Sequence, residues 1–159
     1  MVAAGRDPGR LALLPALGAD ATVALTGDRD RDAAGLADAA SGVDLVLDYV
    51  WGTPAIEAMV AVLRGRADRS RELNWIQIGA VAGPSIELPS VALRSANLRL
   101  QGTGQGAVSA RAYLAELPAL IDELDQGTLQ VTTRSIPLSA VREAWTAAEE
   151  PGVRTVLVA

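Results

Sequence analysis

The stretches VDLVLDYV (residues 43–50) and NWIQIGAV (residues 74–81) decide the fold class. Both are nearly continuous apolar runs, which is typical of strands buried on both faces of a parallel sheet. A helical pattern, Pro54–Arg64, lies between them, and strand-like and helical segments go on alternating along the chain. Alternation of this kind implies βαβ units with right-handed crossovers. The sequence therefore predicts an α/β fold with a parallel sheet.

The other elements follow from the same periodicity of apolar residues. Strands are expected at Val2–Ala4, Thr22–Leu25, Asp44–Val50, Asn74–Ile78, Leu98–Gln101, Gln130–Arg134 and Thr155–Val158. Helices are expected at Pro8–Leu17, Ala33–Ala40, Pro54–Arg64, Val108–Leu124 and Leu138–Glu149. The charged run GDRDRD (residues 27–32) is expected to be a solvated loop, because charge runs usually lie at the surface.

The first residues, MVAAGRDPGRLALLPALG (residues 1–18), predict a strand, a turn and a short helix. Asp7 is a candidate N-cap, Pro8 a first helical residue, and Gly18 a stop signal. In folds built from such units the first strand normally carries a glycine-rich nucleotide loop. No such loop occupies this turn, and neither GxGxxG after a first strand nor a phosphate loop with its Lys is found.

Composition excludes several kinds of function. The 159 residues suffice for one domain with a core, and the net charge of −5 argues against nucleic acid or an anionic membrane as partner. The chain has no Cys and no His, which excludes zinc sites of thiolate or imidazole ligands and Ser-His-Asp or Cys-His catalysis. No apolar run reaches the roughly 18–20 residues of a membrane span, and no signal peptide is visible, so a cytoplasmic protein is expected.

The first strand ends at Gly5, and a basic residue, Arg6, follows it, with Arg10 one helical turn further on. In dinucleotide folds a basic residue at this kind of position accepts a 2′-phosphate, since guanidinium pairs with phosphate in bidentate fashion. The alternative is that Arg6 only solvates a turn. The residues alone leave both interpretations open.

Three further strand ends carry residues that suit a ligand site, because ligands bind at the carboxyl ends of strands in open α/β sheets. Tyr49 and Trp51 could wall a ligand, or they could be rim or core packing. The glycines at 79 and 83 could bring backbone close to a ligand, or simply make a turn. The glycines of Gly102–Gly106 could form an anion-binding nest before the next helix.

The long helix Val108–Leu124 has a broad apolar face, and Gly127 is expected to stop it. After it, QVTTRSIPL (residues 130–138) alternates like a half-exposed strand, SAVREAWTAAEE (139–150) is helical, and RTVLVA (154–159) is a terminal strand. The apolar face of the helix consists of Val108, Tyr113, Leu114, Leu117, Leu120, Ile121 and Leu124.

The order of these segments resembles the cofactor half of the medium-chain dehydrogenase/reductases, and within them the zinc-independent, quinone oxidoreductase-like branch. The resemblance covers essentially the whole chain and rests on the order of its motifs. It implies a Rossmann-like, doubly wound parallel sheet that binds NADP(H). The segments that carry it are VAAGRDPGRLALLPALGADATVALTGD (2–28), GVDLVLDYVWGTPA (42–55), LNWIQIGAVAGPSIELPSVALRSANLRLQGTGQG (73–106), IPLSAVREAW (136–145) and GVRTVLV (152–158).

By this resemblance, four groups of residues contact the cofactor. Arg6, supported by Arg10, would meet the 2′-phosphate of NADP(H), and the remaining groups would lie along its other parts. Hydride transfer in this branch is mostly positioning, with the cofactor supplying the chemistry. No catalytic residue and no metal ligand is assigned. The further groups are Tyr49, Val50 and Trp51 flanking the cofactor, Gly79, Ala80 and Val81 along the nicotinamide side, and Gly102, Thr103 and Gly104 near the nicotinamide or a dimer contact.

Aligned with this family, the chain is expected to begin at the second Rossmann strand, without the catalytic domain, first strand and glycine-rich loop. In the order 3-2-1-4-5-6 that leaves two inner edges unpaired. Residues 1–127 are interpreted as a partial NAD(P)-binding domain and residues 128–159 as a segment that would return to the catalytic domain. We then expect weak or no NADPH binding by this chain alone, and a tail whose strand RTVLVA lacks its native sheet.

Two functions remain open on the sequence. The first is an NADP(H)-dependent oxidoreductase acting on a small carbonyl, quinone or alcohol, which would need a completing catalytic domain. The second is an inactive α/β module or interaction subunit. A homodimer or association with a missing half is expected, whereas nucleic acid and membrane are not.

Overall fold

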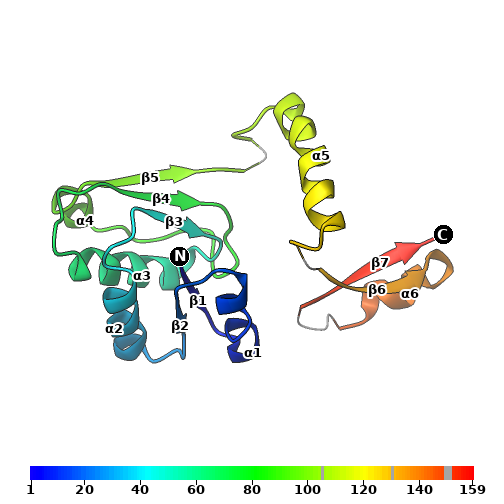
Figure 1. The fold of residues 1–159 in the computed structure, drawn as a ribbon, viewed down its shortest axis with the longest axis horizontal. Helices are drawn as coiled ribbons and strands as arrows, with labels where there is room; N and C mark the ends of the chain where they lie inside the picture. The colour runs from blue at the N-terminus through cyan, green and yellow to red at the C-terminus, as the bar shows by residue number, and fades with distance from the viewer. Residues whose placement is uncertain (105, 130, 149–151) are drawn as a thin grey trace. The chain divides into compact units, whose positions relative to one another are not determined.

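The computed structural model describes residues 1–104, 106–129, 131–148 and 152–159 (Figure 1). The chain separates into two compact units, Met1–Val108 and Ser109–Ala159, which are described one at a time. The predicted division of roles at residues 127 and 128 stays a prediction. In the first unit the elements are β1 (Val2–Gly5), α1 (Pro8–Leu11), the 3₁₀ helix η1 (Leu14–Leu17), β2 (Ala21–Ala24), α2 (Arg29–Ala39), β3 (Leu45–Asp48), α3 (Gly52–Gly65), β4 (Leu73–Gln77), α4 (Ser90–Arg94) and β5 (Leu98–Gly102).

The predicted α/β class with parallel strands is confirmed. In the first unit β1 pairs in parallel with β2, and β3, β4 and β5 form a second parallel sheet in that order. Strands alternate with helices as expected, and the short helix α4 is an addition that the sequence patterns did not indicate. The parallel strands therefore have their carboxyl ends at one edge of each sheet.

The two sheets of this unit are separate, and β1 and β3 are each an edge strand. In a parallel ladder, alternate residues send both backbone groups to the same side. Asp44 and Asp48 accept bonds from β4 and its flank, so Leu45 and Leu47 direct their backbone groups to the open edge of β3. Within the described residues, β1 and β3 thus each have one edge without a strand partner. That these are the two inner edges of a larger sheet stays a prediction.

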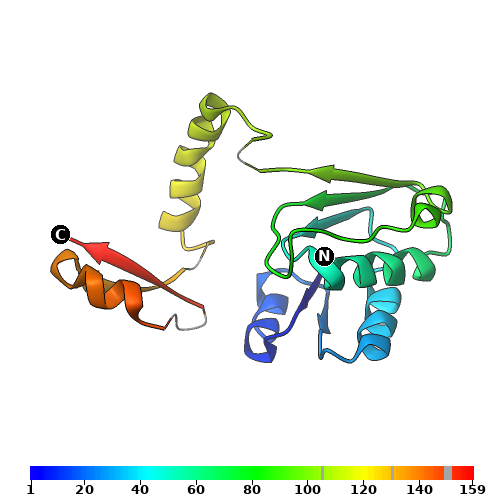
Figure 2. The same cartoon turned by 180° about the vertical axis from the view of Figure 1, so that it is seen from behind.

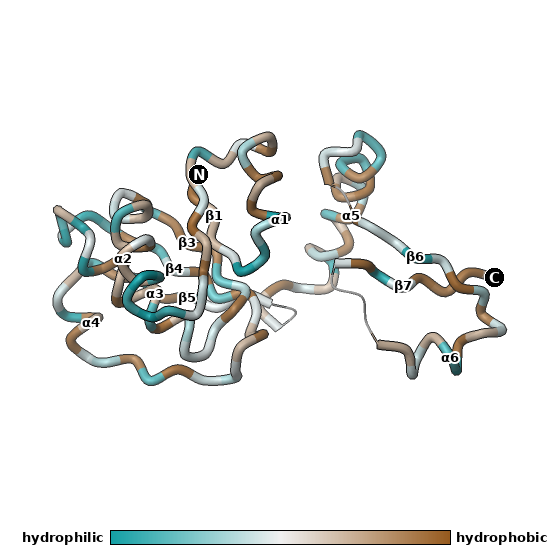
Figure 3. Tube along the Cα trace, turned by 90° about the horizontal axis from the view of Figure 1, so that it is seen from below, coloured by the Kyte–Doolittle hydropathy of each residue, from teal (hydrophilic) through white to brown (hydrophobic). Residues whose placement is uncertain are grey.

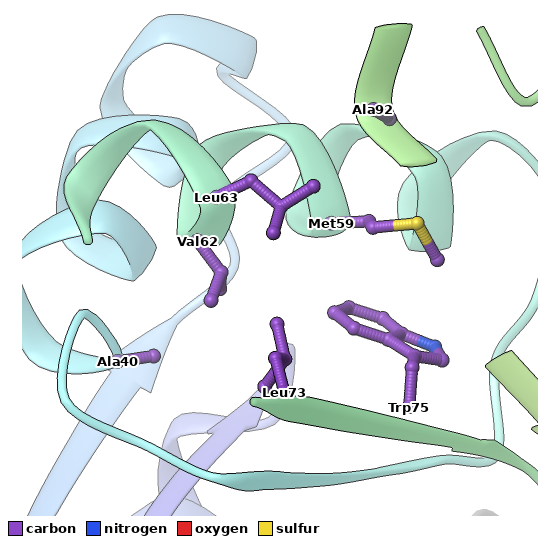
Figure 4. Close-up of a cluster of buried hydrophobic side chains, with 7 residues drawn as sticks. All are labelled: Ala40, Met59, Val62, Leu63, Leu73, Trp75 and Ala92. Carbon is purple, nitrogen blue, oxygen red and sulfur yellow. The ribbon is translucent and has the colours of Figure 1, made fainter. Parts of the chain in front are cut away.

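The main core lies between α3 and the β3-β4-β5 sheet (Figures 1 and 2). Met59 and Leu73 are fully enclosed, and the indole of Trp75 rises from β4 toward Met59 (Figure 4). A second, smaller cluster of Val23, Leu36 and Ala61 joins β2, α2 and α3. Small side chains allow the close α2–α3 packing: a Cβ at Gly65 would collide with the backbone of Ala37.

The expectation that VDLVLDYV is buried on both faces is wrong. Val46 packs against the main core and Asp48 is buried, but Leu45 and Leu47 are each 54% exposed. Their side chains alternate to the opposite face of the sheet. An apolar run shows only that both faces can be covered, and α3 covers one of them.

Capping residues determine where the helices α1 and α2 begin. Asp7 caps α1 by accepting a hydrogen bond from the Arg10 amide at 3.1 Å, and Pro8 begins the helix, as predicted. The run GDRDRD is solvated, but it is not all loop: α2 already begins at Arg29. The reason is that Asp28 is its N-cap, accepting bonds from the amides of Asp30 and Arg31.

The second unit contains α5 (Ala110–Asp125), β6 (Thr132–Pro137), the 3₁₀ helix η2 (Leu138–Ala140), α6 (Val141–Thr146) and β7 (Val153–Val158). β6 begins two residues later than expected, and Gln130 and Glu149, the limits of two predicted elements, lie outside the described residues. β7 pairs in parallel with β6, another strand of the same tail. That this pair lacks the larger native sheet of the family stays a prediction. Apolar residues nevertheless remain at the surface of this unit, along α5 and β7 (Figure 3).

Among the helices in the described ranges, none combines the length and the apolar character that crossing a bilayer requires.

Candidate functional site

Three of the four predicted groups of site residues come together at the carboxyl edge of the β3-β4-β5 sheet. Residues 49–51 follow β3, residues 79–81 follow β4, and Gly102 ends β5 with residues 103 and 104 behind it. The register aligns the strand ends, with Asp48 beside Gln77 and Gln77 beside Gly102. This is the edge at which open α/β sheets bind ligands.

Hydrogen bonds fasten the first two of these loops to each other. The Asp48 carbonyl accepts from the amides of Ile78, at 2.7 Å, and Gly79, at 3.1 Å. The Val50 carbonyl accepts from the Ala82 amide at 2.8 Å. The loop after β3 and the loop after β4 therefore form one backbone-paired structure.

Gln77 joins the third loop, which follows β5, to the loop after β4. Its backbone carbonyl accepts from the Thr103 amide at 2.8 Å, and its side-chain Nε2 donates to the Gly79 carbonyl at 3.0 Å. Gly104 lies beyond these bonds in open space. Gln105, within the predicted glycine nest, is outside the described residues.

The glycine at position 79 is required by the neighbouring loop. A Cβ on Gly79 would lie 2.6 Å from the carbonyl oxygen of Tyr49. Gly52, with φ +65°, is in the same situation, because its Cβ would lie 2.9 Å from the Ala82 backbone. These glycines let two loops approach each other, and a contact of Gly79 with a cofactor stays a prediction.

A buried carboxylate, Asp48, organises the turn after β3. Its Oδ1 accepts hydrogen bonds from the amides of Val50, at 2.8 Å, and Trp51, at 2.9 Å, while Oδ2 accepts from the indole Nε1 of Trp75 at 2.9 Å. Asp48 was not among the site residues predicted from the sequence. An acid that ends an apolar strand and precedes a turn was the available signal, since such side chains often bind amides two or three residues ahead.

Trp51 has a backbone conformation that side-chain-bearing residues rarely adopt, with φ 52° and ψ −165°. Such conformations cost on the order of 1–3 kcal/mol and persist only where the surroundings enforce them. Trp51 precedes the first residue of α3, Gly52, whose φ is also positive. The start of α3 is therefore held at this edge in an unusual geometry.

The rim of the site is apolar and open. Tyr49 is 57% exposed and Val81 86% exposed, and Val50 is exposed as well. Trp51 is half-buried. The exposure of Tyr49 excludes packing in the core. That Tyr49 walls a ligand stays a prediction, beside the alternative that it only forms the rim.

Arg6 and Arg10 lie at the carboxyl end of the other sheet. Arg6 is exposed and forms no ion pair within the described ranges, whereas the Nε of Arg10 lies 3.8 Å from the Asp7 carboxylate. In the part of the chain that the structure describes, no hydrogen bond or ion pair joins these side chains to the three loops. The two ends of the predicted cofactor site thus belong to different sheets.

In the described residues, neither a metal cluster nor the groove between α2 and α3 coincides with this edge. Among the described residues, no group of three or more His, Cys, Asp or Glu is placed to hold a metal ion. A groove of about 930 Å³ runs between α2, α3 and residues 85–89, and none of the predicted site residues lines it.

Comparison with known proteins gives consistent matches. Residues 17–154 match the family model described as zinc-binding dehydrogenase. The chain is 28% identical over 131 residues to a probable NADPH-dependent quinone reductase of Emericella nidulans, covering 77% of this chain and 36% of that protein.

Solved structures share the fold. A quinone oxidoreductase of Pseudomonas syringae matches 99% of this chain and 48% of its own, with a TM-score of 0.65 and 21% identity. CurA of Vibrio vulnificus, solved in complex with NADPH, matches 98% of this chain and 48% of its own, with a TM-score of 0.64 and 14% identity. The chain thus spans between about a third and a half of the length of these relatives.

Proposed function

This chain belongs to the zinc-binding dehydrogenase family of the medium-chain dehydrogenase/reductases, and on that premise we propose that it is the NADP(H)-binding part of a quinone reductase-like oxidoreductase. The reaction would be hydride transfer to or from a small carbonyl, quinone or alcohol. The observation that carries the proposal is the gathering of three loops at the carboxyl edge of β3-β4-β5, two of them bonded to each other and the third joined to them through Gln77.

The residues of this chain fit the two ends of such a cofactor. Arg6 offers an exposed guanidinium that would pair with a 2′-phosphate, with Arg10 in support. No carboxylate ends β1 to hold a free 2′-hydroxyl, which favours NADP(H) over NAD(H). Tyr49, Val50 and Trp51 supply an apolar rim on the other side. The cofactor, when bound, supplies the hydride chemistry, and the chain's own task is to orient it and to exclude water. The loops Gly79–Val81 and Gly102–Gly104 complete the proposed contacts.

Zinc does not fit this chain. Its thiolate and imidazole ligands are absent from the sequence, and no step is derived through a metal. The pyrophosphate of the cofactor also lacks a GxGxxG loop within these residues. Binding by this chain alone is accordingly expected to be weak.

The open edges of β1 and β3 favour association as a condition for activity. Leu45 and Leu47 leave both their backbone groups and half of their side-chain surface uncovered at this position. Unpaired strand edges attract further strands. We propose completion by a missing half or a second copy, in the cytoplasm. The same observation supports the alternative function, an α/β interaction module without turnover of its own.

The direct test is titration of the ¹⁵N-labelled chain with NADPH, followed through the amide signals of the three loops. Shifts of residues 49–51 and 79–81 are expected at millimolar NADPH, with NADH giving smaller ones. If the signals of these loops do not shift, whether or not other signals do, the proposal fails and the non-catalytic module is the function that remains for this chain.

A further inference from the structure

The turn Asp48–Gly52 is held by one buried side chain in a conformation that its own sequence does not favour. Trp51 has φ 52°, and a bulky side chain disfavours positive φ. The two amides that enter this turn, those of Val50 and Trp51, both donate to the same oxygen, Oδ1 of Asp48. One atom thus fixes the direction of the chain over two peptide units.

The other carboxylate oxygen connects this turn to the core. Oδ2 of Asp48 accepts from Nε1 of Trp75, whose ring is packed beneath Met59 (Figure 4). Trp75 lies on the neighbouring strand, two residues before Gln77, the register partner of Asp48. Both oxygens therefore have partners, and the carboxylate is held from the strand side and from the turn side.

Residues 50 and 52 of this turn also hold the loop after β4 in its conformation. Gly52 lies against the Ala82 backbone, and the Val50 carbonyl accepts from the Ala82 amide at 2.8 Å. If the turn relaxed, this contact could not be kept in its present form. The exposed Val81 is carried on the same loop.

We propose that Asp48 is a positioning residue that sets both cofactor-facing loops, 49–51 and 79–83, in one conformation before any ligand binds. The inference rests on the proposed function for the identity of the ligand, an NADP(H) cofactor. The effect of Asp48 on the geometry of the loops does not depend on the proposed function. Asp48 itself is buried behind the turn and acts through the backbone of Val50 and Trp51.

Backbone amide hydrogen exchange in the ¹⁵N-labelled full chain tests the geometry. Asp48→Ala is expected to speed exchange at Val50 and Trp51 by roughly ten- to a hundredfold, because each amide loses a bond to a charged acceptor. Asp48→Asn keeps an oxygen at Oδ1 and should restore most of this protection. The control is Asp44→Ala, which removes an exposed carboxylate just before the same strand.

The amide of Val62, in the core-facing part of α3, reports global stability. Acceleration confined to residues 50, 51 and 82 supports the proposal, whereas equal acceleration at Val62, or none at Val50 and Trp51, overturns it. Should Asp48→Ala fail to fold, Trp75→Phe provides the second variant. It removes only the Oδ2 partner and should speed exchange at residues 50 and 51 by a smaller factor. Unchanged exchange at both residues in Trp75→Phe would then overturn the proposal.

NADPH titration of the same variants separates the two ideas. If wild-type loops shift with NADPH, Asp48→Ala should weaken those shifts and Asp48→Asn should restore them. If the wild-type chain shows no NADPH response while exchange still depends on Asp48, the proposed function fails and the positioning role stands. If NADPH binds equally well to wild type and to Asp48→Ala with loosened amides, the cofactor role of Asp48 is overturned.

Discussion

The indole Nε1 of Trp75 donates a hydrogen bond of 2.9 Å to the Asp48 carboxylate, joining the core of the first unit to the edge where its loops gather. Trp75 is buried by apolar neighbours, and Asp48 is buried one strand away. A buried polar group without such a partner would cost about 1–3 kcal/mol. Substitutions in this core are therefore expected to change the conformation of the candidate site as well as the free energy of unfolding.

The fully enclosed core side chains should dominate stability. Leu73→Ala is expected to lower the free energy of unfolding by about 2–5 kcal/mol, because it removes buried methyl groups and leaves a cavity beside Met59 and Trp75. Urea denaturation measures the loss. Leu13→Ala, at an exposed position, is the control and should change stability little; similar losses for both variants would contradict the core described here.

The close approach of the two site loops predicts a steric effect. Gly79→Ala places a Cβ 2.6 Å from the Tyr49 carbonyl oxygen, so one backbone must move, at a cost of about 1–3 kcal/mol. Thermal unfolding and the amide spectrum of residues 49–51 report it. Gly42→Ala, where a Cβ would meet open space, serves as the comparison. A stable Gly79→Ala variant with an unchanged spectrum would mean that the loops are not paired in this way.

Acid should release the loop before α2. The Thr26 amide, assisted by the Thr26 hydroxyl and the Gly27 amide, holds the pKa of the Asp32 carboxyl below its usual value. Since the folded pKa is lowered, the stabilisation is complete above the unfolded value of about 3.9 and is lost as pH falls through the lower folded pKa.

Asp32→Asn should therefore reduce stability at neutral pH, and its difference from wild type should shrink below about pH 4. Urea midpoints across this pH range give the measurement. Asp38→Asn, an exposed acid later in the same helix, should show no comparable trend. A difference for Asp32→Asn that grows toward low pH would reverse the sign argued here.

Preference for NADPH is expected to depend on Arg6. In the active assembly, Arg6→Ala should raise the KM for NADPH by roughly ten- to a hundredfold, through loss of a charge-assisted pair, and leave that for NADH nearly unchanged. Arg29→Ala removes an exposed arginine that pairs with Glu57 at 2.9 Å, and it is the matched control. Equal effects of Arg6→Ala on both cofactors would remove the 2′-phosphate role.

Self-association is expected through the second unit. Trp145 is 86% exposed, and several apolar side chains around it are also accessible, an arrangement that favours contact with other molecules. Light scattering should show a mass that rises with concentration, and Trp145→Ser should reduce the rise. Leu17→Ser changes an exposed apolar residue of the first unit and should not. A monomer at high concentration would show that the surface is tolerated as it stands. Five further apolar residues of the tail are expected to take part, namely Ile136, Leu138, Val141, Val156 and Val158.

The sequence predicted the order of strands and helices along the chain, and from their alternation the parallel direction of the strands. That information is local, because it lies in apolar runs, helix caps and glycine stops. Asp7, Pro8 and Gly18 act as their patterns indicated. The exposure of Leu45 and Leu47 could not be predicted this way, because burial depends on what covers a face. The charged run 27–32 was misjudged because charge was weighed above Asp28 as an N-cap.

The candidate site was predicted as a set of strand ends and not as a bonded structure. Residues 49–51, 79–81 and 102–103 meet because the strands are in register, which periodicity does not reveal. Asp48 was missed although a local signal was available, whereas its bond with Trp75, 27 residues away in sequence, could not be predicted. The sequence offered a ligand contact or a turn as the reason for Gly79, and the close approach of the Tyr49 carbonyl is a further reason that only the structure shows.

The division of the sheet also has a consequence for cooperativity. No ladder joins β1-β2 to β3-β4-β5 in the described residues, and the small cluster of Val23, Leu36 and Ala61 links them through helices. Regions with few buried apolar side chains open at a lower free energy than the core, and around β1 and α1 only Leu11 is buried. The part that carries Arg6 is therefore expected to unfold at lower cost than the part that carries Asp48, so that partial opening exposes the arginine end first and leaves the loop end intact.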